Sequence, residues 1–539
     1  MNKAIIRVLL GSSALFWATT AMAQDPAPQP AETAEPDQSD ATADAVIAEA
    51  VAIDDAQARI ELLQAQVEAL QEALENVKAS MVKTTPSWKG APLFEDKEGG
   101  WSFKPRGRIM YDAGYVENPN DNVNTRNLGF NTRLRRMRLG AEGTIPGDFG
   151  YKFEMDFASA GVSFGDVIMT YSPKGKPWSF TVGNHESFES LEQITSSRFI
   201  SFLERAQMND AFNASRRIGA SFGLVNKPGT ARFNAGLFAA HSIDGGFDNE
   251  GWIGAARGTY SPQALGGMLH LGANFQYRKF QSNNNQTVSN SVGAPSTNQL
   301  ARYRARPFTQ TTDIRFVDTG SFAAKSDYIA GLELGGIFKS FHVVGEAQWT
   351  KVNVGYDPGS LLLGGGDIES GLDQFVNNSG GIPAYATPSS DPTFFSVYGE
   401  VGYYFTGETR GYKNGAWDRT KVLHPFSKGG WGALQGNLRL DWLDLDDDDL
   451  KDAMTHNFAN GTNSLASLNS RNGRGGKQLG YLAGLIWIPE DYFRVLLNYA
   501  HAEVTGGPQA AVVKPNSSKD IDKRKYGVDV VAARVQVDF

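Results

Sequence analysis

The last nine residues, VAARVQVDF from Val531 to Phe539, decide the fold class. Apolar side chains stand at every second position and end on Phe539, while Arg534, Gln536 and Asp538 occupy positions between them. A period of two indicates a β-strand whose two faces meet different surroundings. A strand with one face towards lipid and the other towards water is typical of a transmembrane β-barrel.

The same alternation recurs along the chain from about Trp101. In 149–157, aromatic and methionine side chains share one face, and Lys152, Glu154 and Asp156 share the other. Sixteen such segments can be placed, at 101–115, 131–145, 148–158, 163–173, 178–184, 216–226, 230–241, 251–261, 267–280, 326–338, 341–352, 394–406, 431–445, 477–488, 492–504 and 526–539. The sequence therefore predicts an all-β fold, a 16-stranded antiparallel transmembrane β-barrel over 101–539.

The connections between these segments differ in length. Short turns such as 146–148 and 489–491 tend to alternate with long polar loops such as 281–325 and 353–393. Turns at one end and loops at the other are the arrangement of outer-membrane barrels, with both barrel ends in the periplasm. The connection 407–430 departs from this pattern, because it should be a short turn and is long. A soluble β-sandwich is the alternative, but it would not explain the repeated aromatic residues on the apolar face.

Composition excludes several other classes of protein. The 539-residue chain contains no cysteine, which excludes disulfide scaffolds, cysteine-ligated zinc modules and thiol enzymes. Beyond the N-terminus, no run of 18 apolar residues predicts a membrane-spanning helix. The net charge of −8 arises mainly from 24–55, which holds nine acids and no base. The remainder is nearly neutral and lacks the basic excess of a nucleic-acid binder.

Four segments precede the predicted barrel. Residues 1–23 have the basic start, apolar middle and small-residue end of a secretory signal peptide, for which a membrane anchor is the alternative. Residues 24–52 form an Ala/Pro-rich acidic linker that can bury little apolar area. A coiled coil in the periplasm is expected at 53–82, followed by a second linker at 83–100.

The coiled-coil prediction rests on a heptad repeat. Apolar side chains recur at alternating spacings of three and four, at Ile53, Ala56, Ile60, Leu63, Val67, Leu70, Leu74, Val77 and Met81. This seam predicts a short left-handed coiled coil that associates between chains. A helix packed against its own chain is the alternative.

Arginines are frequent at positions that strict alternation turns into the barrel lumen. On the second strand, Arg136 and Arg138 share the inward face with Glu142. Arg133 and Arg135 fall on the opposite face, unless a β-bulge turns them inward. Further inward positions are Arg217, Arg232, Arg257, Arg278, Arg439, Arg494 and Arg534. Guanidinium groups stay charged and favour anions in a pore, but these arginines can equally pair with lumen acids.

Two loops hold further candidate residues. The segment 185–215 is too long and too apolar for a simple surface loop, so we expect it to fold into the barrel. It would bring Ser196, Ser197, Arg198, Glu204 and Arg205 close to a constriction, and a subunit contact is the alternative. The acidic run 444–449 could supply oxygen ligands for Ca²⁺, but it lacks the turn glycine and closing glutamate of an EF-hand. A solvated acidic loop is the better interpretation, and no metal site is assigned.

Several short stretches stand in a fixed order along the predicted barrel. They are the arginine-rich 133–138, QITSS at 193–197 leading to FLER at 202–205, TGETRGY at 406–412, PF and GGWGA within 425–433, and Asn498-Tyr499. With a terminal Phe, this order resembles the phosphate-selective porin O and P family over roughly 100–539. The resemblance implies a homotrimer of 16-stranded barrels, with an inward-folded third loop and anion passage along arginines.

The resemblance also implies site residues. Ser196, Ser197 and Arg205 on the third loop and Asp166 on the wall would form the constriction. The anion pathway would run along Arg136, Arg138, Arg217, Arg232 and Arg257. Phosphate-specific members carry a lysine shortly before the serine pair, where this chain has Glu192 and Gln193. This departure bears on phosphate specificity more than on the porin assignment.

The leading hypothesis is a porin that passes phosphate or related small anions by passive diffusion, with no enzymatic activity and no cofactor. A general or weakly selective diffusion porin is one alternative. An envelope tether, using the coiled coil with the barrel as its anchor, is another.

Expected partners follow from the same hypothesis. They are further copies in a homotrimer, outer-membrane lipids and lipopolysaccharide, and small anions. The assembly machinery would recognise the last strand ending at Phe539, and the coiled coil could reach the cell wall. The expected location is the bacterial outer membrane, and no nucleic-acid partner is expected.

Overall fold

The computed structural model divides into two units, Met1–Ser80 and Met81–Phe539. It describes residue 119 and the ranges 57–75, 87–96, 98–117, 127–159, 161–243, 251–280, 300–354, 385–388, 390–451, 454–457, 464–466, 474–510, 512–513 and 520–539. The predicted signal peptide, the acidic linker and both ends of the predicted coiled coil lie outside the described residues.

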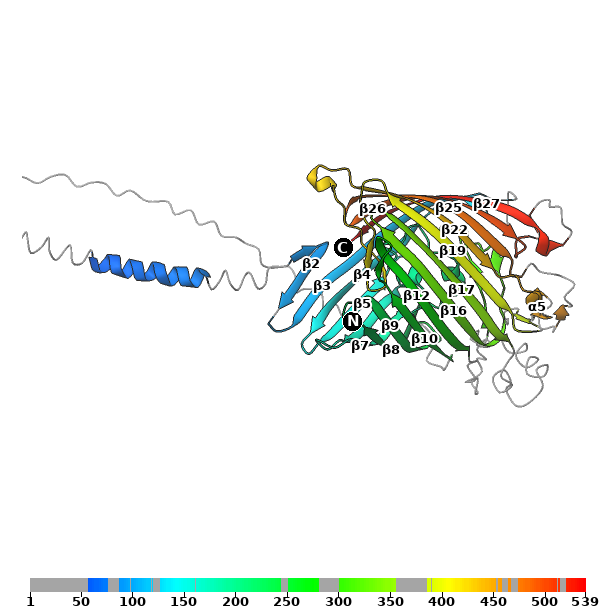
Figure 1. The fold of residues 1–539 in the computed structure, drawn as a ribbon, viewed down its shortest axis with the longest axis horizontal. Helices are drawn as coiled ribbons and strands as arrows, with labels where there is room; N and C mark the ends of the chain where they lie inside the picture. The colour runs from blue at the N-terminus through cyan, green and yellow to red at the C-terminus, as the bar shows by residue number, and fades with distance from the viewer. Residues whose placement is uncertain are drawn as a thin grey trace, which may run out of the picture. The chain divides into compact units, whose positions relative to one another are not determined.

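Sixteen of the described strands form one closed antiparallel barrel (Figure 1). They are β3 (Trp101–Val116), β4 (Gly129–Ile145), β5 (Phe149–Asp156), β6 (Ser163–Tyr171), β7 (Trp178–Glu186), β8 (Arg216–Val225), β9 (Ala231–Ala239), β10 (Gly251–Tyr260), β12 (Gly267–Phe280), β16 (Phe322–Phe338), β17 (Phe341–Val354), β19 (Thr393–Tyr404), β22 (Ala433–Asp444), β25 (Lys477–Glu490), β26 (Phe493–Thr505) and β27 (Lys525–Asp538). Each predicted strand corresponds to one of these, so the predicted barrel is confirmed.

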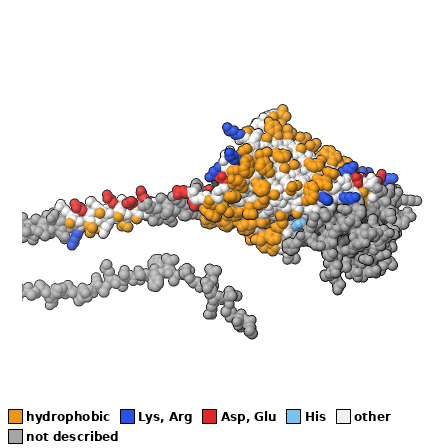
Figure 2. All heavy atoms as spheres, turned by 90° about the horizontal axis from the view of Figure 1, so that it is seen from below, with side chains coloured by type: hydrophobic (Ala, Val, Ile, Leu, Met, Phe, Trp, Pro, Cys, Tyr) orange, Lys and Arg blue, Asp and Glu red, His pale blue; other side chains and the backbone are white. Residues whose placement is uncertain are grey.

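The two faces of the wall follow the alternation in the sequence. On β5, Phe149 and Phe153 are 48% and 40% exposed on the outside, whereas Glu154 and Asp156 are buried inside. Hydrophobic side chains form a broad band over the outer surface in the face shown in Figure 2. Apolar outside and charged inside is the arrangement of a barrel in lipid.

The barrel closes where the last strand meets the first. β27 pairs with β3 from Val530 opposite Val116 to Asp538 opposite Arg108. Beyond β27, Phe539 and Gly107 exchange two backbone hydrogen bonds of 3.0 and 3.1 Å. The ring of Phe539 covers Gly107, where an added Cβ would lie 2.2 Å from the ring. The aromatic terminus therefore packs on the closing seam and needs a glycine beneath it.

Shorter elements decorate the ends and the interior of the barrel. The remaining strands are β1 (Ser87–Lys89), β2 (Ala91–Asp96), β11 (Gln263–Ala264), β13 (Leu300–Ala301), β14 (Arg304–Ala305), β15 (Val317–Asp318), β18 (Tyr385–Thr387), β20 (Gly411–Lys413), β21 (Ala416–Asp418), β23 (Met454–Asn457) and β24 (Ser464–Ala466). The short helices are α2 (Leu191–Ile194), α3 (Gln207–Ala211), α5 (Asp448–Lys451), η2 (Phe426–Lys428) and η4 (Ile521–Lys523).

Part of the predicted linker 83–100 forms strands. β1 and β2 pair with each other, and β2 pairs with the start of β3. The rings of Phe94 and Phe103 lie 6.4 Å apart across this pair. These aromatic contacts and the added backbone bonds explain why the segment is ordered next to the first barrel strand.

A separate helix covers 57–75 in the N-terminal unit. Five side chains of the predicted heptad seam are exposed by half or more, namely Ile60, Leu63, Val67, Leu70 and Leu74. None of the described helices is long and apolar enough to cross a membrane. Residues 57–75 therefore form a helix, and its association into a coiled coil stays a prediction.

Replacing Gly107 by valine should destabilise the closed barrel, because the new side chain meets the Phe539 ring. Overpacking of this kind costs about 1–3 kcal/mol. Gly258→Val is the matched control, since an added Cβ there has nothing within 4 Å. We expect Gly107→Val alone to lower the temperature at which the barrel unfolds in a heat-shift electrophoresis assay. Equal unfolding temperatures for the two variants would contradict the role given to the seam.

Candidate functional site

A β-bulge on β4 turns the arginine-rich stretch into the lumen. Met110 of β3 pairs with Arg136, but the next residue of β3 pairs with Leu134, so Arg135 is an extra residue. Arg133 donates to the backbone oxygen of Gln310, and Arg135 binds Glu204 in the third long loop. The bulge that the sequence allows is therefore present, and both arginines face the interior.

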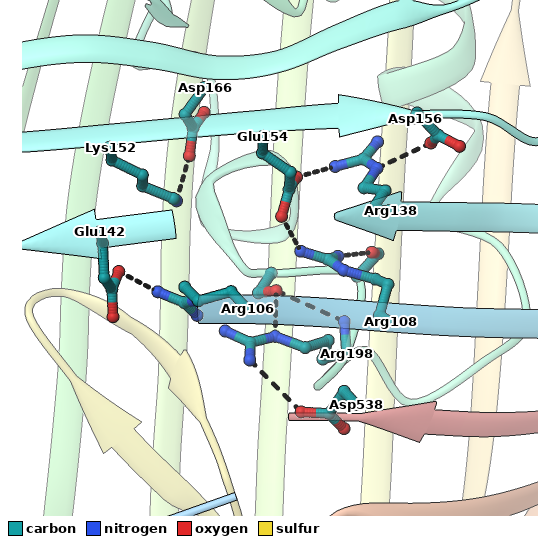
Figure 3. Close-up of polar contacts among 12 residues, drawn as sticks. Arg106, Arg108, Arg138, Glu142, Lys152, Glu154, Asp156, Asp166, Arg198 and Asp538 are labelled. Carbon is teal, nitrogen blue, oxygen red and sulfur yellow. Dashed lines mark hydrogen bonds and ion pairs between the residues drawn. The ribbon is translucent and has the colours of Figure 1, made fainter. Parts of the chain in front are cut away.

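Oppositely charged side chains alternate along the inner face of β3 to β6 (Figure 3). Arg108 contacts Glu154 at 2.9 Å, and Arg138 contacts both Glu154 and Asp156, at 2.5 and 2.7 Å. Two further pairs, Arg106 with Glu142 and Lys152 with Asp166, extend this ion-pair ladder. In this ladder, the arginines pair with acids of the wall, which is the alternative that the sequence left open beside anion binding.

The third long loop, residues 187–215, folds into the barrel as expected and is here called L3. Carboxylates of the wall hold its two short helices. Glu346 of β17 accepts hydrogen bonds from the backbone nitrogens of Leu191 and Glu192, at 2.8 and 2.9 Å. Asp441 of β22 accepts from the backbone nitrogen of Gln207 at 3.0 Å. These carboxyl oxygens thereby satisfy backbone N–H groups at the start of each helix, so the wall fixes the path of L3.

Apolar side chains of L3 fill one side of the lumen. Ile200, Phe202 and Leu203 are at most 2% exposed. Phe202 and Leu203 belong to a cluster with inward side chains of β25, β26 and β27, among them Leu482, Ile486, Leu496, Ala500, Ala502, Val528 and Val530. This part of the wall therefore faces a packed core. On the part that begins at the next strand, β3, and runs to β8, Arg106, Glu142, Lys152 and Arg216 keep side-chain exposures of 20–35%. Water can therefore reach the side chains of this polar wall.

The long connection between β19 and β22, residues 405–432, also enters the lumen and is here called the turn segment. Its hairpin of β20 and β21 places Trp417 in the core cluster. The backbone nitrogen of Trp417 donates to Thr195 of L3 at 3.2 Å. Arg410 donates to Ser201 of L3 at 2.6 Å and reaches Glu400 at 3.3 Å. The connection that broke the turn pattern therefore buttresses L3 from inside the barrel.

The described part of the fifth long loop, residues 300–321, leans inward as well. Arg306 contacts Asp210 of L3 at 3.1 Å. The ring of Phe308 packs against Gly480, where an added Cβ would lie 2.1 Å from it. A cavity of about 160 Å³ remains between this loop, L3 and the wall. Its lining includes Arg135, Gln193, Glu204, Arg205 and Arg306.

The constriction residues predicted from the family lie along L3 and the polar wall. Ser196 accepts from Arg198 at 3.2 Å, and Ser197 accepts from Arg108 of the ladder at 2.6 Å. Asp166 is held between Lys152 and Arg216. The two serines thus meet the ladder directly, and Asp166 forms its far end.

Arg205 has a different environment from the ladder arginines. Its guanidinium donates to the backbone oxygens of Glu192 at 2.8 Å and Thr195 at 2.7 Å. Within the described residues it forms no ion pair. It therefore organises the L3 backbone and retains its charge beside the 160 Å³ cavity.

Arg136 is the least compensated arginine on the second strand. It is 8% exposed, and its Nε atom has no hydrogen-bond partner. No ion pair of Arg136 occurs among the described residues. Its charged neighbours include Arg135, Arg138 and Arg205, and also the acid Glu204. Arg135 and Arg138 have their own carboxylate partners, so Arg136 is the arginine of this group on β4 that has none among the described residues.

Glu204 of L3 stays ionised beside these arginines. Burial alone would raise the pKa of its carboxyl, but the Arg135 and Arg534 guanidiniums outweigh burial and hold the pKa below its usual range. Arg135 binds it through two nitrogens at 2.7 and 2.9 Å. One carboxylate is thereby shared between two guanidiniums, and Arg136 is left without one.

The other predicted pathway arginines have mixed surroundings. Arg217 donates to the backbone oxygens of Ala240 and Arg216. Arg232 donates to Asn414 in the turn segment at 2.8 Å. Arg257 forms a buried two-nitrogen pair with Glu333, at 2.7 and 2.8 Å.

The comparisons with known proteins agree with this architecture. The model of the family described as phosphate-selective porin O and P matches residues 103–539. The chain belongs to this family. It is accordingly an outer-membrane porin, a channel and not an enzyme.

A relative and two solved structures illustrate the likeness. An uncharacterized protein of Caulobacter vibrioides is 32% identical over 471 residues, which are 86% of this chain and 78% of the relative. The outer membrane channel DcaP of Acinetobacter baumannii is 15% identical, with a TM-score of 0.43, over 83% of this chain and 99% of DcaP. An anion-selective porin from Comamonas acidovorans is 12% identical, with the same TM-score, over 81% and 100% of the two chains.

The sequence alone did not predict the role of some residues in the lumen of this porin. Arg410 and Trp417 lie in the connection 407–430, whose unusual length was the one available signal. Arg108 and Arg106 stand on a strand whose alternation predicts inward positions, but their partners depend on register. No group of three or more residues that could hold a metal ion occurs in the described ranges, the acidic run 444–449 included.

Arg410→Ala should loosen the turn segment, because it removes the bonds to Ser201 and Glu400 while Arg439 still compensates Glu400. A cysteine placed at buried Val422 reports this in a chain without other cysteines. We expect maleimide labelling at this cysteine to accelerate about tenfold, the effect of losing charged hydrogen bonds of about 1.5–3 kcal/mol. Lys413→Ala, at an exposed position of the same hairpin, is the control. Unchanged labelling in Arg410→Ala would refute the buttress.

Proposed function

We propose that this porin passes small anions, phosphate or its relatives, by passive diffusion along the polar wall of its lumen. The observation that carries the proposal is Arg136, a buried guanidinium without an ion-pair or hydrogen-bond partner among the described residues. A buried charge is costly unless it is compensated. A permeating anion would compensate Arg136 at the narrow part of the lumen.

A pathway for the anion can be drawn from the described residues. From the loop end, Arg133 and the 160 Å³ cavity with Arg205 lead towards Arg136. Arg108 and Ser197 follow on the same wall, and Arg106 lies nearer the turn end of β3. Guanidinium and hydroxyl donors suit phosphate and carboxylate oxygens, so each of these groups can take part in transient hydrogen bonds.

The departure at Glu192 and Gln193 does not oppose anion passage. Glu192 is 1% exposed, and its carboxylate binds Arg439 at 2.8 Å, so its charge is neutralised away from the pathway. Gln193 donates to Glu186 at 2.8 Å. The lysine of phosphate-specific members is absent here, and phosphate binding would depend on Arg136 and Arg205 instead.

The ion-pair ladder favours a second candidate, a weakly selective diffusion porin. Each described ladder cation has an acid within 3 Å, which reduces its field on passing ions. Selectivity then depends on the excess charge at Arg136 and Arg205 alone. Arg257, paired with Glu333 and bonded to the Gly415 oxygen, supports the turn segment in this scheme and does not line the pathway.

Arg136→Gln should reduce the preference for anions, because it removes the uncompensated charge. The measurement is the reversal potential of single channels in a planar bilayer under a KCl gradient. We expect the wild type to select chloride, Arg136→Lys to keep most of that preference, and Arg136→Gln to lose several-fold of it. Lys174→Gln, on an exposed turn, is the control with the same charge change.

Phosphate titration separates the two candidates. Block of the chloride current by phosphate, weakened in Arg136→Gln, would support a phosphate-type site. Anion preference without block would leave an anion porin without phosphate specificity. Cation preference of the wild type would contradict the proposal and show that the lumen acids dominate.

The helix over 57–75 belongs to the same proposal as a periplasmic trimerisation element. Its exposed seam of Ile60, Leu63, Val67, Leu70 and Leu74 needs apolar partners, and three copies would supply them. The trimer would sit in outer-membrane lipid after assembly through the strand that ends at Phe539. A tether to the cell wall is the alternative use of this helix.

Deletion of 53–82 should leave the single-channel conductance unchanged and lower the temperature at which the oligomer separates on a gel. The reason is that the exposed seam would add association energy outside the barrel. Loss of envelope attachment in cells, with conductance and oligomer unaffected, would instead support the tether.

A further inference from the structure

The outer surface of the barrel has an aromatic group near the loop end of six described strands. Trp252 and Tyr277 lie 5.1 Å apart between ring centroids, and Tyr277 and Tyr328 lie 5.0 Å apart. Trp349, Phe395 and Trp442 continue the group, at 5.0 and 5.6 Å. Aromatic side chains at this height mark the boundary between hydrocarbon and headgroups.

Three lysines stand directly beyond this aromatic group. Lys279 follows Tyr277 on the outward face of β12, and Lys351 follows Trp349 on that of β17. Lys325 is an extra residue at a bulge of β16, next to Ser326, which pairs with Lys279. The register therefore brings three cations together on three adjacent strands.

These lysines have exposed side chains and no charge partner in the described part of the chain. In the face shown in Figure 2, lysine and arginine side chains lie at both ends of the hydrophobic band, the loop end included, and not within it. Ammonium groups at the rim of a membrane surface attract anionic headgroups. The patch thus combines three cations with an apolar, aromatic floor towards the membrane centre.

We propose that Lys279, Lys325 and Lys351 bind the phosphate groups of an acylated glycolipid in the outer leaflet. Its acyl chains would lie against the aromatic side chains, chiefly Tyr277, Tyr328 and Trp349. Charge complementarity and the height of the lysines favour a lipid, because headgroup phosphates occupy the level just outside the aromatic boundary. The site is separate from the lumen, so the inference is independent of the anion passage proposed above.

The test compares two triple variants of the full chain. Lys279→Gln/Lys325→Gln/Lys351→Gln removes the patch, and Lys174→Gln/Lys176→Gln/Lys227→Gln removes three exposed lysines at the turn end. The probe is purified lipid A carrying two phosphates, and binding to the detergent-solubilised protein is followed by native mass spectrometry. Enzymatically dephosphorylated lipid A and inorganic phosphate are the comparison ligands.

We expect the patch variant to bind phosphorylated lipid A at least about tenfold more weakly than the wild type, and the control variant to bind within about twofold. Dephosphorylated lipid A should bind all three proteins weakly, and millimolar inorganic phosphate should not displace the lipid. Single-channel conductance of the patch variant should equal that of the wild type, which shows that the barrel is folded.

Three results would overturn the proposal. Equal affinity of the wild type and the patch variant would show that the lysines do not bind the lipid, and tight binding of dephosphorylated lipid A would show that phosphate is not recognised. A patch variant that separates into single chains while still binding the lipid would assign the surface to a neighbouring copy.

Discussion

The buried guanidinium of Arg439 joins the inner loop to the barrel wall, and the interior depends on this junction. Its Nη2 atom contacts Glu192 of L3 at 2.8 Å and Glu400 of β19 at 2.6 Å. The guanidinium also lies over the rings of Phe202 and Tyr398, at 4.8 and 4.6 Å. Because all three charges are buried, loss of one partner would leave the others uncompensated. L3 is therefore held in one position, with its apolar side chains on one wall and its serines facing the other.

This junction makes the lumen asymmetric. The side bounded by β25 to β27 is packed like the core of a soluble protein, and the side bounded by β3 to β8 carries paired charges that water can reach. The turn segment reinforces the packed side through Arg410 and Trp417. In the function proposed above, a permeating solute would follow the polar wall, where Arg136 and Arg205 would favour anions. On the outer surface, the three lysines stand together beyond the aromatic group, where the proposed lipid phosphates would lie.

The strands could be predicted from the sequence because each carries its own alternation, and a barrel wall imposes that alternation locally. The sequence is compatible with a bulge at Arg135 but does not predict it, because one extra residue leaves the alternation on both sides intact. The ion pairs of Arg108, Arg138 and Arg439 could not be predicted, because they depend on register and on contacts far apart along the chain. The path of 405–432 was hidden for the same reason: its length was visible, but its partners in L3 were not. The linker at 83–100 contains strands because aromatic contacts with β3 add order that composition does not reveal.

The most direct test of the account is to locate an anion in the lumen. Crystals of the wild-type protein grown with selenate, a tetrahedral dianion, would show its position by anomalous diffraction. The account predicts an anomalous peak of selenium about 4 Å from the Arg136 guanidinium nitrogens, with selenate oxygens at the about 2.7–2.9 Å of charge-assisted hydrogen bonds. Selenate found elsewhere in the lumen, with Arg136 instead bound by a protein carboxylate, would contradict it.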